Sequence, residues 1–260
     1  MTHFRIALVS SILVTALAIS GVATAAPTQL DQVKAAGTLK VGTEGTYAPF
    51  TFHDPSNALT GFDVEIARAI ASRLGVKAEF VEGKWDGLIA GLDAKRYDVV
   101  INEVTVTDAR KAKYDFSDVY IVSKAALIVR SDNAVLKSFA DLKGKKAGES
   151  LTSNFAQLAR SYGADVVQVD GFNQAVDLLL AGRVDATIND SLSFLDFKKQ
   201  KPDAALKAVD FQKNADLQAV LLRKDNPELL AAINKAIADI KADGTYLAIS
   251  RKYFNDDVSK

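Results

Sequence analysis

The sequence predicts an α/β protein built as two lobes that are joined by a two-strand hinge. Short apolar runs alternate with longer helical periods, which is the rhythm of a sheet covered by helices. This rhythm starts again after Ser123, and a repeat inside the chain falls at equivalent points of the two units. With 260 residues, 48% of them hydrophobic, the chain is long enough for two small domains.

Residues 1–25 have the pattern of an export signal. His3 and Arg5 form a short charged start, residues 6–22 are mostly apolar, and Ala23-Thr24-Ala25 supplies small residues for a signal peptidase. A membrane anchor is the alternative, but the apolar run is short and no basic flank follows it. We therefore expect a cleaved signal peptide and a soluble protein in a periplasm, where a protein without an anchor is retained.

The two units are predicted element by element from the apolar periodicity. In the first unit we expect strands at residues 39–41, 78–81 and 98–101, and helices at 62–74 and 85–94. In the second we expect strands at 125–129, 145–147, 166–169 and 184–188, and helices at 155–162 and 173–181. A strand at 219–222 and helices at 227–242 and 246–254 end the chain, with Pro227 suited to a first helical turn.

These elements predict the lobe boundaries. Residues 26–121 and 219–260 form lobe 1, and residues 122–218 form lobe 2. The terminal segment is too apolar to lie alone, so the chain has to cross back to lobe 1. We expect that crossing near residues 216–218, where two strands connect the lobes as a hinge.

The repeat places polar residues at one edge of each lobe. Residues 96–103 (Arg-Tyr-Asp-Val-Val-Ile-Asn-Glu) match residues 183–190 (Arg-Val-Asp-Ala-Thr-Ile-Asn-Asp) without a gap, and residues 40–42 correspond more loosely to residues 146–148. Each copy ends a strand with Asn followed by an acid, at the carboxyl edge where open α/β sheets bind ligands. Asn102, Glu103 and Asp190 are therefore candidate ligand contacts.

Arg110 is the candidate for binding an anion. Thr107 is a suitable N-cap and places Arg110 in a first helical turn, where the helix dipole disfavours a cation. A ligand carboxylate resolves this conflict because a guanidinium binds it through two hydrogen bonds, and Thr105 is positioned to add another. The alternative is an ordinary surface arginine beside Asp108 and Lys111.

Aromatic and acidic side chains are expected at the same crevice. Tyr47 and Trp85 lie on loops at one sheet edge and can enclose an apolar stem or a cation, although core packing is the usual role of such residues. Glu44, Glu103 and Asp190 exceed the one carboxylate that an α-ammonium needs, which suggests a second positive charge on the ligand. Either glutamate alone could equally face solvent or pair with a lysine.

The second lobe offers a helix start, and the composition excludes several other kinds of site. Thr152, Ser153 and Asn154 precede a predicted helix and suit a carboxylate. The chain has no cysteine, and its two histidines, His3 and His53, have no ligand-spaced partner, so we expect no disulfide, metal site or cofactor. Basic and acidic residues number 32 each, which gives no indication of nucleic-acid or membrane binding.

Together these segments resemble the family 3 extracellular solute-binding proteins, the polar amino-acid receptors of ABC importers. The resemblance covers nearly the whole mature chain. It is carried by residues 42–50 (Gly-Thr-Glu-Gly-Thr-Tyr-Ala-Pro-Phe), 61–74, 105–110 (Thr-Val-Thr-Asp-Ala-Arg), 114–117, 142–146 and 243–246 (Asp-Gly-Thr-Tyr). It implies the type II periplasmic binding protein fold, closure about a hinge, no catalysis, a monomer, and an inner-membrane permease as partner.

The resemblance also implies roles for single residues. Tyr47 and Trp85 occupy the aromatic sandwich, Arg110 and Thr105 the α-carboxylate site, and Asp190 the α-ammonium site. Glu44, Asn102 and Glu103 stand where ligand contacts vary among members. Thr152, Ser153, Asn154 and Phe155 align with the ligand loop of the second lobe, but this chain lacks the common Gly-Thr there.

Residues 84–87 and 98–105 look most like those of cystine-binding receptors, which often carry Gln where this chain has Glu103. Cystine has two ammonium and two carboxylate groups, which suits a pocket with surplus acids. Lysine, arginine or histidine is the alternative ligand. A cyclohexadienyl dehydratase-like enzyme is the alternative function on the same scaffold, with Asp190 or Glu103 as its acid.

Overall fold

A computed structural model describes Met1 and residues 26–260 of the chain. The predicted signal peptide, residues 1–25, lies outside the described residues apart from Met1. Over the part that is described, no helix combines the length and the apolar character needed to cross a membrane.

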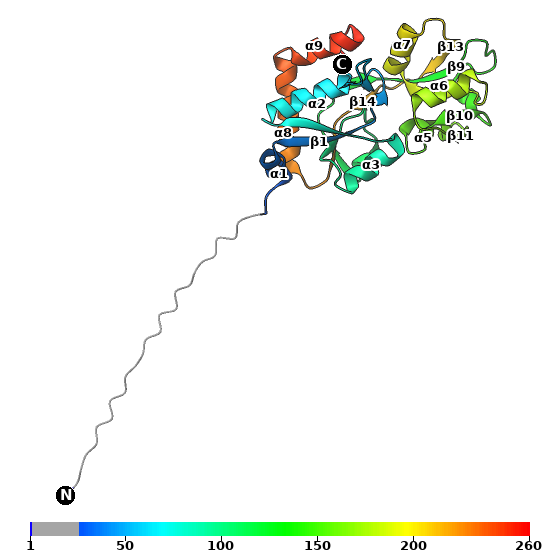
Figure 1. The fold of residues 1–260 in the computed structure, drawn as a ribbon. Helices are drawn as coiled ribbons and strands as arrows, with labels where there is room; N and C mark the ends of the chain where they lie inside the picture. The colour runs from blue at the N-terminus through cyan, green and yellow to red at the C-terminus, as the bar shows by residue number, and fades with distance from the viewer. Residues whose placement is uncertain (2–25) are drawn as a thin grey trace.

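The first sheet has the strand order β5-β1-β6-β15-β7, in which β5, β1 and β6 run parallel and β15 is antiparallel to β6 and β7. The strands are β1 (Thr38–Thr43), β5 (Lys77–Glu82), β6 (Val99–Val100), β7 (Tyr114–Phe116) and β15 (Leu221–Arg223). Helices α1 (Gln29–Ala36), α2 (Phe62–Arg73), α3 (Trp85–Asp93), α8 (Pro227–Ala242) and α9 (Thr245–Phe254) belong to the same lobe. Figure 1 shows the blue and cyan start of the chain beside its orange and red end.

Apolar faces of the helices form the core of this lobe. In α2, Ile66 and Ile70 recur at helical spacing and are fully buried, as are Ile233 and Ile237 in α8. The terminal segment thus packs on the first lobe, as its apolar character predicted.

The second sheet repeats the order of the first. Strands β9 (Ala125–Arg130), β12 (Thr187–Asp190) and β13 (Leu206–Phe211) form one part, and β10 (Lys146–Glu149) and β11 (Asp165–Gln168) the other. A parallel bridge from Ala147 to Ala186 joins them, which gives β11-β10-β12-β9-β13. Helices α5 (Asn154–Ser161), α6 (Phe172–Leu180) and α7 (Ser191–Gln200) pack on this sheet, and Figure 1 shows them together at the green and yellow end of the molecule.

The internal repeat is visible as a repeated contact. Asp98 Oδ2 accepts a hydrogen bond from the Lys40 backbone N–H at 2.9 Å, and Asp185 Oδ2 accepts one from the Lys146 N–H at 2.8 Å. The aspartates are equivalent in the repeat, and so are the lysines. Each aspartate therefore ties the segment before its strand to the neighbouring strand, β1 in the first lobe and β10 in the second.

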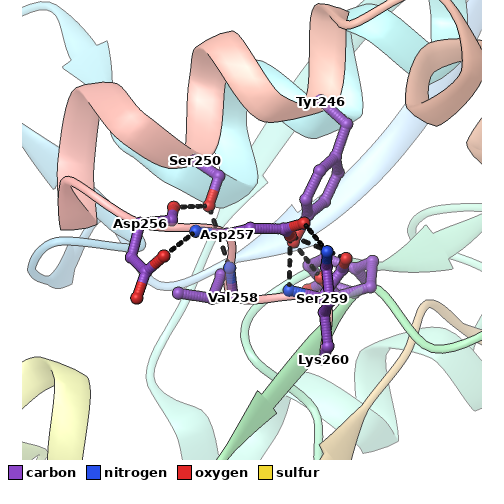
Figure 2. A network of polar contacts seen from close by, with 8 residues as sticks. Tyr246, Ser250, Asp256, Asp257, Val258, Ser259 and Lys260 are labelled. Atoms are coloured by element: carbon purple, nitrogen blue, oxygen red, sulfur yellow. Dashed lines mark hydrogen bonds and ion pairs between the residues drawn. The ribbon is translucent and has the colours of Figure 1, made fainter.

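Strands β8 (Ile121–Ser123) and β14 (Asp216–Gln218) pair antiparallel between the two sheets and form the predicted hinge. The C-terminal tail packs against this hinge, since Val258 O accepts a hydrogen bond from the Val122 N–H at 2.7 Å. Figure 2 shows how the tail is held: Ser250 Oγ accepts the Val258 N–H, and the Asp257 carboxylate accepts the Ser259 N–H. The hinge is thus braced by the last residues of the chain.

Several predicted boundaries were wrong. The strand expected at 98–101 is only Val99–Val100, the one at 184–188 is shifted to Thr187–Asp190, and the one at 219–222 is Leu221–Arg223. The strand expected at 145–147 extends to Glu149. The short helix expected after the cap at Thr107 is α4 (Asp108–Lys111). Sequence periodicity also missed short or weakly patterned elements: α1, β2 (Thr46–Tyr47), β3 (Thr51–His53), β4 (Leu59–Thr60), β7, η1 (Phe139–Leu142), β13 and α7. Two- and three-residue strands carry too few side chains to show a period.

Candidate functional site

A pocket lies between the two lobes and collects most of the predicted site residues. Its wall includes, of the predicted set, Glu44, Tyr47, Trp85, Asn102, Glu103, Ser153, Asn154 and Phe155. The first five come from the first lobe and the last three from the second. The carboxyl edges of both sheets therefore face one another across a single pocket.

The lobes touch directly around this pocket. Tyr47 Oη donates to Asn189 Oδ1 at 2.8 Å, and Ser193 Oγ donates to the Ala48 carbonyl at 2.9 Å. At the rim, the Asp86 carboxylate accepts hydrogen bonds from the N–H and the hydroxyl of Thr152, both at 2.9 Å. These contacts hold the cleft in a closed form.

Asn102 fixes the position of Glu44. Its Oδ1 accepts the Glu44 N–H at 2.8 Å, and its Nδ2 donates to Glu44 Oε2 at 2.6 Å. Burial raises the pKa of Glu44 to about 7, although the bond from Asn102 favours the charged form. A cationic ligand group beside it would favour the ionised carboxylate.

Glu103 is held in a strained conformation by a buried aspartate. Its φ is +51°, a left-handed value that is rare outside glycine, and its N–H donates to Asp63 Oδ2 at 2.6 Å. Tyr120 Oη donates to the other oxygen of Asp63 at 2.9 Å. Burial raises the pKa of Asp63 to about 7. Glu103 lies close enough to Asp190 of the second lobe for the charge of that aspartate to raise its pKa.

Glu103 and Asp190 form a pair of carboxyls across the lobes. Burial raises the pKa of both, and the negative charge of Asp190 raises that of Glu103 further. Each carboxyl therefore disfavours ionisation of the other unless a cation lies beside them. Asp190 also caps α7 by accepting the Leu192 N–H at 2.8 Å, and it accepts the Ser123 hydroxyl.

Arg110 lies where its local sequence predicted. Thr107 caps α4 by accepting the Arg110 N–H at 3.2 Å. The guanidinium donates from Nη1 to the Thr105 carbonyl at 2.7 Å and lies 5.2 Å from the centre of the Trp85 ring. Burial lowers the pKa of Arg110 to about 10. No ion pair of Arg110 occurs among the described residues.

Five buried polar atoms lack a hydrogen-bond partner within the described part of the chain. They are Trp85 Nε1, Glu103 Oε1, Thr105 Oγ1, Arg110 Nη2 and Gln218 Oε1. Such atoms are rare in native proteins, and each costs free energy when left unpaired. All five belong to the first lobe or to the hinge strand β14. Their chemistry fits a ligand that has both anionic and cationic groups.

The structure does not bring every predicted residue into the pocket wall. Thr105, Arg110 and Asp190 lie behind the wall, next to its members Trp85 and Glu103. Thr152 lies at the rim with its hydroxyl on Asp86. Its predicted neighbours Ser153 and Asn154 remain in the wall, with Ser153 capping α5.

Sequence reasoning missed other residues of the wall. Asn189 could have been found, because it is the counterpart of Asn102 in the repeat. Glu149 is the counterpart of Thr43 in the looser match, and a lone glutamate after Gly148 gives almost no signal. Gly171 and Phe172 at the start of α6 also face the pocket.

Comparisons of sequence and of structure both match this chain to amino-acid-binding proteins. The L-cystine-binding protein TcyA of Bacillus subtilis is 45% identical over 229 residues, which are 88% of this chain and 85% of that protein. An ancestral arginine-binding protein solved with arginine bound is 43% identical, with 84% of this chain and 98% of that chain covered and a TM-score of 0.79. The L-cystine solute receptor of Neisseria gonorrhoeae, solved unliganded and open, is 44% identical, with 86% and 95% covered and a TM-score of 0.57.

The last two matches differ in conformation more than in sequence. Their identities to this chain are nearly equal, yet the arginine-bound structure superposes much better than the open one. This agrees with the direct contacts between the lobes. The family model of the bacterial extracellular solute-binding proteins, family 3, matches residues 39–256. The chain therefore belongs to the family 3 extracellular solute-binding proteins and has their two-lobed periplasmic binding protein fold.

Proposed function

We propose that this chain is the substrate-binding component of an amino-acid ABC transporter, with L-cystine as its favoured ligand. Residues 26–121 with 219–260 and residues 122–218 act as two lobes that close on the ligand about the hinge. The closed monomer is then recognised by an inner-membrane permease. Cleavage of residues 1–25 delivers the protein to the periplasm.

The main observation behind this proposal is that buried hydrogen-bonding groups beside the pocket have no partner among the described residues. Arg110 Nη2 and Thr105 Oγ1 are buried donors with no acceptor among the described residues, and a ligand α-carboxylate would accept from both. Asp190 and Glu103 lie next to them and would accept an α-ammonium. Tyr47 and Trp85 in the wall would enclose the stem of the ligand.

The ligand is narrowed in two steps. The pocket wall contains Glu44 and Glu103 with Asp190 beside them, which is more carboxyl groups than one ammonium neutralises and favours a ligand with two cationic groups, either cystine or a basic amino acid. Between these two, similarity to a cystine-binding protein favours cystine. The curated relative TcyA, which is 45% identical, is named for L-cystine binding. Lysine, arginine or histidine is the alternative, which the named ligand of the ancestral arginine-binding protein supports.

A thermal-shift panel of the amino acids and cystine tests the proposal. A ligand that binds only the native state raises the melting temperature according to its concentration over its Kd. We expect the largest shift with L-cystine. No shift with any amino acid would remove the proposed function, whereas a shift with arginine or lysine and none with cystine would overturn only the ligand.

One observation favours an enzyme as the second candidate. Glu103 is a buried carboxyl in the pocket wall whose raised pKa keeps it protonated, as a general acid requires. A dehydratase acting on arogenate or prephenate would use such a group. Incubation with either compound, followed by absorbance of the aromatic product, separates the two functions, because a receptor shows no turnover.

A further inference from the structure

Glu149 is a buried carboxyl that the proposed α-carboxylate and α-ammonium contacts leave unused. It ends strand β10 in the second lobe, is 3% exposed, and forms part of the pocket wall. It is the only glutamate between residues 122 and 218. Charged side chains are almost never buried without a partner, so its position needs a reason.

The structure accounts for only one oxygen of this carboxyl. Oε1 accepts the Ile188 N–H at 2.6 Å and lies 3.4 Å from Thr187 Oγ1. Thr187 Oγ1 lies closer, at 2.9 Å, to the Gly148 carbonyl, to which it donates. Among the described residues no donor reaches Oε2 and no lysine or arginine forms an ion pair with Glu149.

The charges around Glu149 do not neutralise it. Glu44 and Glu103 share the pocket wall, and Asp190 follows two residues after Ile188 on β12, so the neighbours are acids. The positive charge of Arg160 on α5 lowers the pKa of Glu149, but its guanidinium donates to the Leu151 carbonyl at 3.2 Å. Burial outweighs Arg160 and raises the pKa of Glu149 well above its usual value.

The spacing along β12 places Glu149 away from the α-ammonium site. Its Oε1 bonds to the N–H of Ile188, two residues before Asp190, and strands rise by about 3.3 Å per residue. The backbone positions to which these two carboxyls belong or bind, residues 188 and 190, are therefore separated by roughly 7 Å along the strand. A ligand held at Asp190 by its α-ammonium reaches Glu149 with a group at the far end of its side chain.

We propose that Glu149 determines specificity by binding a second cationic group of the ligand through Oε2, so that the pocket selects amino acids with two cationic groups. This inference rests on the proposed function. The second cation is the distal α-ammonium of cystine, or the ammonium or guanidinium of a basic amino acid. Because Glu149 belongs to the second lobe and Arg110 to the first, the contact forms only when the cleft closes, and it slows ligand release.

Glu149→Gln tests the charge alone, because a glutamine oxygen still accepts the Ile188 N–H. Calorimetry compares matched ligands: L-cystine with S-(2-carboxyethylthio)-L-cysteine, which lacks one ammonium, and L-lysine with L-norleucine. We expect the affinity ratio within the pair that binds to fall by about tenfold to a hundredfold in the variant. The pair that shows this fall identifies the source of the second cation.

Asp177→Asn on α6 is the matched control, because it removes one exposed carboxylate from the same lobe without touching the pocket. It should leave the ratio unchanged. An unchanged ratio in Glu149→Gln, with ligands still bound, would overturn the inference and leave the proposed function standing. Absence of binding by all ligands to the wild type would instead overturn the proposed function.

Proton release gives a second test that needs no variant. Burial raises the pKa of Glu149 well above its usual value, and a cation beside it favours ionisation, so we expect binding to release a proton from Glu149 to the buffer. Calorimetry in buffers of different ionisation enthalpy should show about one more proton released with L-cystine than with its mono-ammonium analogue. Equal proton release for the two ligands would contradict the inference.

Discussion

The two copies of the internal repeat end in similar residues but have different tasks in the cleft. In the first lobe, Asn102 binds Glu44 of its own lobe, and Glu103 keeps Oε1 without a partner. In the second lobe, Asn189 reaches across to Tyr47, and Asp190 is occupied by Ser123 and the start of α7. The first lobe thus presents unpaired groups to a ligand, whereas most groups of the second lobe already have partners. Among the described residues of the second lobe, Glu149 is a buried carboxyl with no donor on its Oε2.

The largest effect that we expect from the buried acids of the first lobe is a dependence of the protein's stability on pH. Asp63, which supports Glu103, has a pKa near 7 in the folded chain and near its ordinary 3.8 when unfolded. The native protein therefore binds more protons than the unfolded chain between about pH 4 and pH 7, and the free energy of unfolding falls as pH rises through that window. With Glu44 and Glu103 shifted in the same direction, we expect a decrease on the order of several kcal/mol.

Urea unfolding at a series of pH values measures this dependence. The contributions of Asp63 and Glu44 should level off above about pH 7, where both groups are ionised in the folded and the unfolded chain. In Asp63→Asn the slope should be shallower. A wild-type stability that rises from pH 4 to pH 7 would contradict the protonated cluster.

The next effect separates the two acids of the repeat. Asp190→Asn keeps an acceptor for the Leu192 N–H but removes the charge that we assign to the α-ammonium, so affinity should fall about a hundredfold. Glu103→Gln should change affinity less than about tenfold, because Asp190 still supplies a carboxylate to the ammonium and the glutamine oxygen still accepts a hydrogen bond. Calorimetry with L-cystine measures both. Equal losses in the two variants would mean that the acids share one role.

A smaller effect concerns the rim, where the first lobe accepts hydrogen bonds from the second. Asp86→Ala removes the bonds from the Leu151 N–H and from the N–H and hydroxyl of Thr152. Because these bonds exist only in the closed form, ligand release should become about three- to tenfold faster, with little change in association. Stopped-flow fluorescence of Trp85 measures both rates. Unchanged release would show that Thr152 does not hold the lobes together.

The smallest effect is expected at the other rim contact. Lys84 Nζ lies 2.7 Å from Asp170 Oδ2, but the two side chains are 71% and 58% exposed. Exposed ion pairs contribute little, so Lys84→Ala should change release less than about twofold. An effect as large as that of Asp86→Ala would show that the exposed ion pair stabilises the closed form as much as the hydrogen bonds of Asp86 do.

Local chemistry made part of this site predictable from the sequence. The cap at Thr107 determines the position of Arg110 in the first turn of α4, only three residues later. The repeat places Asn102 and Asp190 at sheet edges, and this requires no knowledge of how the lobes pack. The fold class followed in the same way from the restarted α/β rhythm. These inferences needed only neighbours in the sequence.

The rest depends on contacts between distant segments. The backbone N–H of Glu103 is held by Asp63, 40 residues earlier, and Thr152 is held by Asp86, 66 residues earlier. The burial of Glu149 arises from the packing of β10 beside β12. No local pattern carries such information, which is why Glu149 was missed and Thr152 was expected in the pocket.

The most direct test of the central claim is a calorimetric cycle between Arg110 and the ligand carboxylate. The wild type should bind L-cystine at least about a hundredfold more tightly than cystamine, which lacks the carboxylates. In Arg110→Ala this preference should vanish while the melting temperature of the free protein stays close to that of the exposed control Arg183→Ala. Near-wild-type affinity for cystine in Arg110→Ala, or a preserved preference over cystamine, would contradict the account.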